Sequence, residues 1–173
     1  MTSDQQAEID AIFEELFRDY QQPILNYLYR LVGDSARAEE LAQEAFVKAY
    51  RALPRLPNGA NRRAWLYRIA TNTGYDHLRR RRLIRWLPLQ ESDGLSQSSS
   101  RGDDLQDVLS EEDAVQRTLA QLAPNYRVAL ILYSVQGYST KEIAEILRIS
   151  QGAVKTRLCR ARERFRQLYG EER

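Results

Sequence analysis

The stretch that decides the fold runs from Ser139 to Phe165 and reads STKEIAEILRISQGAVKTRLCRARERF. Ser139 and Glu142 have the spacing of a capping box, which satisfies the free N–H groups at the start of a helix. Apolar residues at helical spacing then predict a short helix over 140–147 and a second helix after Ser150. The apolar positions are Ile143, Ala144, Ile146 and Leu147 in the first helix, and Val154, Leu158, Ala161 and Phe165 in the second. This is the pattern of a helix-turn-helix.

The second helix of this motif is expected to present a polar and basic outer face. With its apolar positions buried, the outward residues are Gln151, Gly152, Lys155, Thr156, Arg157 and Arg160, with Ser150 at the cap. Such a face fits the major groove of DNA, where arginine and glutamine bond base edges. The alternative is an ordinary helical hairpin with a solvated basic face. Arg148 stands in the turn where glycine commonly adopts a left-handed backbone, so we expect a modest cost there.

The composition is that of a globular protein of one or two small domains. The chain has 173 residues, 43% of them hydrophobic, and a formal net charge of +2. Arginine, which suits phosphates and guanine edges, supplies all of the 26 basic residues except Lys48, Lys141 and Lys155. Cys159 and His77 are the only residues of their types, which excludes an internal disulfide and a His/Cys zinc site. No signal peptide and no apolar run of about 18 residues is present, so we expect a soluble, cytoplasmic chain without membrane insertion.

The N-terminal part is predicted to form three helices before a loop. Apolar residues recur at helical steps over 9–20, and Pro23 suits the first turn of a second helix that Gly33 ends. Asp34 or Ser35 then caps the third helix. These helices are expected to share one core.

The third of these helices has a narrow inner stripe and a polar outer face. The stripe consists of Ala38, Leu41, Ala42, Ala45 and Ala49, and the residues that face outward or lie at its edge are Glu40, Gln43, Glu44, Phe46, Val47 and Lys48. On composition alone, this outer face is that of a solvated helix with a weak ion pair from Glu44 to Lys48.

A loop over 53–61, LPRLPNGAN, leads into an arginine-rich helix that starts near Arg62. Its inward side is expected to hold Trp65, Leu66, Ile69, Ala70 and Thr73, and its exposed side Tyr67, Asn72, Asp76, Arg79 and Arg80. Aromatic and amide side chains among arginines suit unpaired bases, and the run over 79–82 suits phosphates. A solvated block of charge is the alternative.

A serine- and glycine-containing acidic segment over 87–109 is predicted to be a flexible linker. Ser110 with Asp113 then caps the first helix of a second domain, and another helix runs from Pro124 to Gln136. We expect that helix to bury Val128, Ile131, Leu132 and Val135. The prediction is therefore an all-α fold with two small helical domains, over 5–86 and 110–170.

These segments, in this order, carry a family resemblance. AEELAQEAFVKAYRAL, then RRAWLYRIATNTGYDHLRRRR, an acidic linker, and LAQLAPNYRVALILYSVQGYSTKEIAEILRISQGAVKTRLCRARERF resemble the extracytoplasmic-function (group IV) sigma factors of the sigma-70 family. The resemblance implies that the first domain is a sigma region 2, which docks on the RNA polymerase clamp and opens the minus-10 promoter element. It implies that the second domain is a sigma region 4, which binds the minus-35 element and the polymerase flap.

The resemblance also assigns roles to individual residues. Docking on core polymerase is implied for Glu40, Gln43, Glu44 and Phe46. Contact with melted minus-10 DNA is implied for Asn61, Arg62, Arg63, Tyr67, Asn72, Asp76, Arg79 and Arg80, and contact with the minus-35 duplex for Ser150, Gln151, Lys155, Thr156, Arg157 and Arg160. The family further implies an anti-sigma factor as a partner, and no cofactor.

Other functions remain open from the residues. A stand-alone helix-turn-helix regulator would need a dimer interface and would leave the helix over 62–82 without a role. A sigma-like decoy that binds an anti-sigma factor is expected to carry a receiver domain, for which this chain has no room. An enzyme is disfavoured because the sequence assembles no carboxylate pair with a supporting histidine, no nucleotide loop and no metal cluster.

Overall fold

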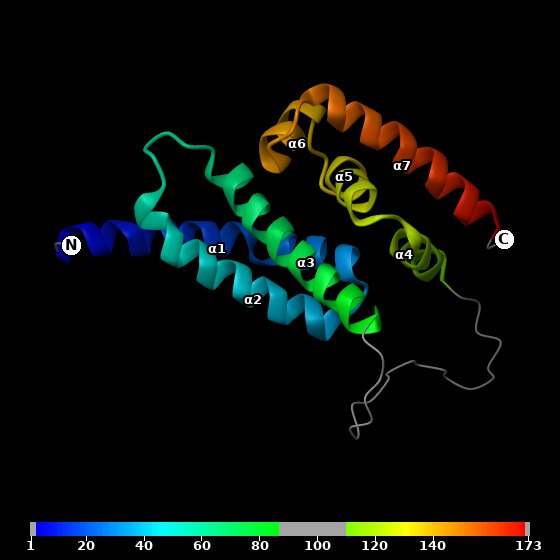
Figure 1. Cartoon of the computed structure of the whole chain (residues 1–173). Coiled ribbons are helices and arrows are strands. Elements are labelled where there is room, and N and C mark those ends of the chain that lie inside the picture. The colour runs from blue at the N-terminus through cyan, green and yellow to red at the C-terminus, as the bar shows by residue number, and fades with distance from the viewer. Residues whose placement is uncertain (1–2, 87–109, 172–173) are drawn as a thin grey trace, which may run out of the picture.

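The computed structural model describes residues 3–86 and 110–171, which form helices and no strand. The N-terminal bundle contains α1 (Ser3–Val32), α2 (Ser35–Ala52), the short 3-10 helix η1 (Leu53–Arg55) and α3 (Arg62–Trp86). The C-terminal bundle contains α4 (Glu111–Gln121), α5 (Pro124–Ser134), α6 (Thr140–Leu147) and α7 (Gln151–Glu171) (Figure 1). The all-α prediction is confirmed. The predicted acidic linker, 87–109, lies outside the described residues.

The N-terminal bundle differs from the prediction at Pro23, where we expected a new helix to begin. The helix α1 instead continues through Pro23 from Ser3 to Val32. A proline inside a helix removes a hydrogen bond and costs about 3 kcal/mol. Fully buried residues just after it, including Ile24 and Leu28, hold the helix against the rest of the bundle. The prediction of a break was therefore wrong, because packing outweighs the local preference.

The end of α1 and the start of α2 follow the predicted signals. Gly33 has a φ of +75°, the left-handed conformation that ends a helix. Asp34 caps α2 by accepting a hydrogen bond of 2.9 Å from the backbone N–H of Arg37. The inner stripe of α2, from Ala38 to Ala49, is buried as expected.

The helix-turn-helix of α6 and α7 has the expected boundaries and caps. Ser139 and Glu142 form both bonds of the capping box, and Ser150 accepts from the N–H of Ala153 at 3.1 Å. Arg148 occupies the turn with a φ of 53°, in the left-handed region. One prediction in α5 was wrong, because α5 ends at Ser134 and the following Val135 is 52% exposed.

The two bundles pack directly against each other along a surface that we call the seam. Helix α3 contacts α6, and α1 contacts α4 and α5, so the buried apolar residues of both bundles form one cluster. Figure 1 shows α3 facing α5 and α6, with α7 on the outer side of the C-terminal bundle. No helix within the described ranges is both long enough and apolar enough to cross a bilayer.

Candidate nucleic-acid interface

The outer face of α7 carries most of the residues expected on it. Exposed side chains there are Gln151, Lys155, Thr156 and Arg160, beside the cap residue Ser150. Gln151 donates from Nε2 to the hydroxyl of Thr140 at 2.8 Å, which ties the first turn of α7 to the first turn of α6. The face therefore combines two long cationic side chains, Lys155 and Arg160, with the side-chain amide of Gln151, which the hydrogen bond to α6 holds in position.

Arg157 is an exception, because its side chain turns toward the seam instead of solvent. It is half-buried and lines a hollow of about 560 Å³ with residues of α3 and of the turn after α6. Burial raises the pKa of Tyr75, on α3, and the nearby charge of Arg157 opposes that shift. The prediction that Arg157 faces outward was wrong for this arrangement of the bundles.

The predicted DNA side of α3 is only partly exposed. Asn72, Arg79 and Arg80 are exposed, whereas Asp76 is half-buried and pairs with Arg79 at 3.1 Å. Arg62 is exposed at the start of the helix. These side chains leave a polar, mostly basic strip along α3.

Tyr67 was predicted to be exposed, and this prediction was wrong. Its side chain is 1% exposed, and burial raises its pKa above the ordinary value for tyrosine. Its ring lies edge to face with Tyr27, at 5.5 Å, and with Tyr138, at 5.0 Å. Its hydroxyl donates to Gln136 at 2.8 Å. Tyr138 and Gln136 come from the C-terminal bundle, so the sequence of α3 alone does not predict these contacts.

The start of α3 faces carboxylates of α6 across the seam. Asn61 caps α3 by accepting from the N–H of Ala64 at 3.0 Å, and its Nδ2 donates to Glu145 at 3.3 Å. Arg63 forms an ion pair with Glu142 and lies with its guanidinium 4.7 Å from the centre of the Tyr138 ring. Two residues expected to contact DNA are thus already bonded to acidic groups of the same chain.

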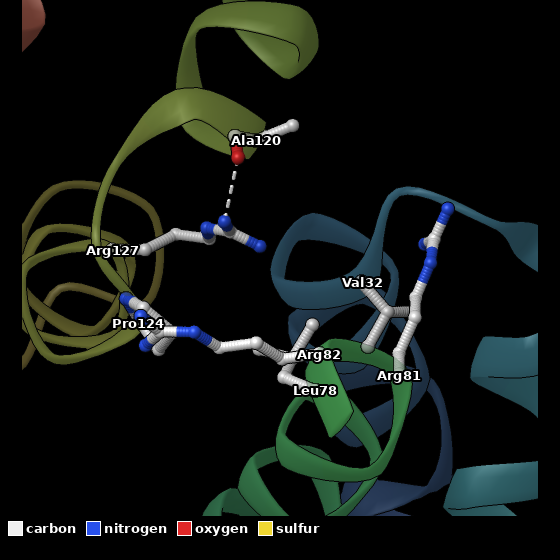
Figure 2. Close-up of a pocket in the computed structure, with 7 residues that line it drawn as sticks. All are labelled: Val32, Leu78, Arg81, Arg82, Ala120, Pro124 and Arg127. Atoms are coloured by element: carbon white, nitrogen blue, oxygen red, sulfur yellow. Dashed lines mark hydrogen bonds between the residues drawn. The ribbon is translucent and has the colours of Figure 1, made fainter. Parts of the chain in front are cut away.

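A second hollow lies at the other end of the seam and is basic. It measures about 750 Å³ and is lined by Val32, Leu78, Arg81, Arg82, Ala120, Pro124 and Arg127 (Figure 2). Arg127 is 7% exposed and donates to the carbonyl oxygens of Ala120, at 2.7 Å, and Leu122, at 2.9 Å. Burial lowers the pKa of Arg127, and the charge of Arg81 adds to that shift.

The outer face of α2 carries the residues expected to dock on polymerase. Glu40, Gln43 and Glu44 are exposed, and Glu44 pairs with Lys48 at 2.7 Å. Phe46 is 5% exposed and lies at one wall of a hollow of about 270 Å³ between α1 and α2.

The same hollow contains a residue that the sequence did not single out. Phe17 is 42% exposed and lies 5.0 Å from Phe46, centre to centre. In the sequence, Phe17 belongs to the apolar repeat of α1, which predicts a core position. No signal in the chain separates it from its buried neighbours.

Comparison with known proteins agrees with this architecture. The sigma-70 region 2 family matches residues 16–84, and the sigma-70 region 4 family matches residues 112–165. The chain is 37% identical to the RNA polymerase sigma-H factor of Pseudomonas aeruginosa, over 87% of this chain and 82% of that protein. It is 33% identical to the ECF RNA polymerase sigma factor SigW of Bacillus subtilis, over 89% of this chain and 87% of that protein.

Solved structures show the same fold. The sigma factor RpoE of Bartonella quintana, in complex with the anti-sigma factor NepR, is 27% identical with a TM-score of 0.68, over 93% of this chain and 98% of that one. CnrH, in complex with the cytosolic domain of CnrY, is 22% identical with a TM-score of 0.65, over 98% of this chain and 97% of that one. The chain belongs to the extracytoplasmic-function sigma factors of the sigma-70 family.

Proposed function

We propose that the chain binds core RNA polymerase and directs it to promoters through two DNA-binding domains, over 5–86 and 110–170. The observation that carries the proposal is that similarity to sigma factors extends over both bundles, and not only over the helix-turn-helix. A stand-alone helix-turn-helix regulator would account for the C-terminal bundle alone.

The C-terminal bundle is proposed to bind the minus-35 element as a duplex. Gln151 and Arg160 on α7 suit base edges in the major groove, while Lys155 suits a phosphate. Ser150 and Thr156 complete this face. Arg157 would also contribute to this face if α3 moved away from α7. The bundle is also proposed to contact the polymerase flap.

The N-terminal bundle is proposed to bind the melted minus-10 element. The segment over 54–63, which includes the first turn of α3, offers Asn61, Arg62 and Arg63 to an unpaired base and its phosphates, and Asn72 extends this surface along α3. Arg79 and Arg80 suit the phosphates of the same strand, and Asp76 orients Arg79. Tyr67 would reach DNA only after the seam opens, because its ring is covered by Tyr138.

Docking on the polymerase clamp is proposed for the outer face of α2. Gln43 lines the hollow that also contains Phe17 and Phe46, and Glu40 and Glu44 are exposed on the same helix. Aromatic residues inside a polar rim are typical of protein interfaces. This combination supports an intermolecular role over that of a merely solvated helix.

The protein is proposed to act by binding energy and not by chemistry, in the cytoplasm, where polymerase and promoters are. An anti-sigma factor is a proposed partner, because the Bartonella quintana relative was solved in complex with one. A decoy would bind such a partner without supporting transcription.

Transcription from a defined promoter with purified core polymerase tests the proposal. Core alone should give no promoter-specific transcript, and addition of the chain should give one. Arg160→Ala should lower transcription and relax sequence preference at one minus-35 position, whereas Lys155→Ala should weaken all promoters alike, because phosphates carry no sequence information. The opposite result would support a stand-alone regulator. In that case the chain would bind promoter DNA as tightly without core polymerase as with it, and would give no transcript when core polymerase is present.

A further inference from the structure

The basic hollow at one end of the seam has cationic walls to which the proposed function gives no role. Its guanidinium groups come from Arg81 and Arg82 on α3 and from Arg127 on α5, and thus from both bundles (Figure 2). Within residues 3–86 and 110–171, no carboxylate forms an ion pair with any of these three arginines. The hollow therefore gathers positive charge that the described part of the chain does not neutralise.

Helix α3 divides its run of arginines between two faces. Arg79 pairs with Asp76, three positions earlier, on the strip that is proposed to bind promoter DNA. Arg81 and Arg82 follow Leu78 by three and four positions, the spacing that places side chains on one face of a helix, and all three line the hollow. This second face therefore supplies cations to the gap between the bundles, where they are available to a different ligand.

Arg127 keeps one hydrogen-bond donor without a partner. A guanidinium carries five N–H groups, and those of Nη1 and Nη2 donate to the carbonyl oxygens of Leu31, Ala120 and Leu122 at 2.6, 2.7 and 2.9 Å. Nε is buried and has no partner among the described residues, although buried donors are nearly always bonded. Because the three carbonyl oxygens are already bonded, this wall presents a cation with an unused donor and not a set of free acceptors.

We propose that the basic hollow is a binding site for a small anion that carries two or more linked phosphate groups, such as pyrophosphate or the phosphate chain of a nucleotide. Arginine suits this ligand because its planar fork matches two phosphate oxygens. Figure 2 shows Arg81 and Arg82 extending in different directions from α3, so an anion with two charged groups fits them better than one with a single charged centre. The site lies outside the proposed promoter-binding and polymerase-docking surfaces and does not depend on them.

The size and lining of the hollow favour a small phosphorylated molecule over a DNA strand. Its volume of about 750 Å³ lies within the range of about 300 to 1,000 Å³ that is usual for small-ligand sites. Arg127 is 7% exposed, so a compact anion can approach it more closely than the backbone of a continuous strand on the surface. Val32, Leu78 and Pro124 add an apolar wall that suits the sugar or base of a nucleotide.

Calorimetric titration of the full chain with inorganic pyrophosphate tests the site. The ionic strength is held at about 0.15 M, because salt at this concentration screens general attraction between exposed charges. We expect saturable binding of one pyrophosphate per chain, and binding of orthophosphate that is at least about tenfold weaker, because orthophosphate reaches fewer guanidinium groups. Magnesium-free ATP separates the two sources of the phosphate chain. Tighter binding of ATP than of pyrophosphate supports a nucleotide site, and equal or weaker binding supports a site for free polyphosphate.

Two variants alter the hollow in different ways. Arg81→Gln/Arg82→Gln removes two exposed cations and should weaken pyrophosphate binding at least about tenfold. Ala120→Glu, at an exposed position that lines the hollow, removes no arginine but places a carboxylate beside all three, and should abolish binding. The matched control Arg18→Gln/Arg51→Gln makes the same change of net charge as the double arginine variant, at exposed positions outside the hollow, and should bind pyrophosphate like wild type.

Three results would overturn the proposal. The first is a wild-type titration without saturation, and the second is an equal loss of affinity in the control, which would mean that pyrophosphate responds only to net charge. The third uses a single-stranded oligonucleotide as the titrant. If Arg81→Gln/Arg82→Gln binds the oligonucleotide more weakly than wild type does, while neither protein binds pyrophosphate, then these arginines contact DNA and the small-anion site is wrong. Melting temperatures without ligand show that each variant is folded, and the wild-type titration decides the question even where a variant is not.

Discussion

Arg127, on α5, donates from Nη1 to the backbone carbonyl of Leu31, on the last turn of α1, at 2.6 Å. The same guanidinium bonds the carbonyls of Ala120 and Leu122 at the end of α4. The buried guanidinium of Arg127 therefore caps the C-terminal ends of α1 and α4, which belong to different bundles. Helix dipoles favour positive charge at these ends. It joins the bundles at the end of the seam away from Glu142.

Replacement of Arg127 by methionine should cost stability. The change leaves three carbonyls without this donor, and a buried acceptor left unsatisfied costs about 1 to 3 kcal/mol. We expect the free energy of unfolding to fall by about 2 to 3 kcal/mol in urea denaturation. Arg55→Met, at an exposed position after α2, is the matched control and should stay within about 0.5 kcal/mol of wild type. A loss for Arg127→Met no larger than that of the control would contradict the capping role.

Gly74 marks a close approach of α3 to α1. A Cβ atom at this position would lie 2.5 Å from Cδ2 of Leu31, whose side chain is fully buried. Alanine normally favours a helix over glycine by about 1 kcal/mol, but overpacking a core costs about 1 to 3 kcal/mol. Gly74→Ala should therefore lower the melting temperature. Gly170→Ala, near the end of α7 with open space around it, should leave the temperature unchanged or raise it.

Much of this fold was predictable because its signals are local. The caps at Asp34, Ser110 and Ser139 and the left-handed Gly33 depend on residues a few positions apart, and each was found where expected. The bounds of α6 were predicted for the same reason.

The errors at Pro23, Tyr67 and Arg157 involve contacts between distant segments. Pro23 was expected to start a helix because its local preference is strong, and only tertiary packing keeps α1 continuous. Tyr67 and Arg157 were expected to face outward because neither residue belongs to the apolar stripe by which its helix was predicted to pack. They are covered because the two bundles meet, and no periodicity within one helix encodes that contact.

Arg148 offers a test of backbone strain in the turn of the helix-turn-helix. A residue other than glycine with a φ of 53° carries a steric cost of about 1 to 2 kcal/mol, which glycine avoids. Glycine also gains entropy when unfolded, so Arg148→Gly should raise the free energy of unfolding by only about 0.5 to 1 kcal/mol. Arg148→Val should lower it, since a β-branched side chain tolerates this conformation poorly. A stability order with valine above glycine would exclude strain at this position.

His77 should make stability fall in mild acid. Burial lowers its pKa below the ordinary value of 6.5, and Arg37, Arg81 and Arg80 add to that shift. The unfolded chain then binds a proton more readily than the folded chain, so stability is full above about pH 6.5 and falls as pH drops toward the folded-state pKa. Urea midpoints between about pH 7.5 and 5.5 should fall in wild type and change less in His77→Gln. Parallel pH profiles for the two proteins would mean that His77 does not contribute.

The outer face of α2 is either a polymerase-docking surface or the polar side of a solvated helix. Substitution of Glu44 distinguishes these two interpretations. Glu44 is exposed and has only Lys48 as its ion-pair partner at 2.7 Å among the described contacts. An exposed pair of this type contributes less than about 1 kcal/mol, so Gln43→Ala/Glu44→Arg should leave the melting temperature nearly unchanged. At an interface with a basic partner, however, the added arginine places like charges together, which can cost several kcal/mol of binding energy. We therefore expect the variant to lose co-purification with core polymerase and promoter-dependent transcription while it remains folded.

Glu14→Arg is the matched control for this loss. It places the same reversal of charge on an exposed position of α1, outside the hollow that Phe17 and Phe46 line. This control should bind core polymerase like wild type, because its charge lies away from the proposed interface. Phe17→Ala supplies an independent probe of the same surface, since removal of a partly exposed ring from an interface hollow weakens binding more than it weakens the fold. If Gln43→Ala/Glu44→Arg and Phe17→Ala both bind core with the affinity of Glu14→Arg, the docking surface is not on this face, and the polar side of α2 is only solvated.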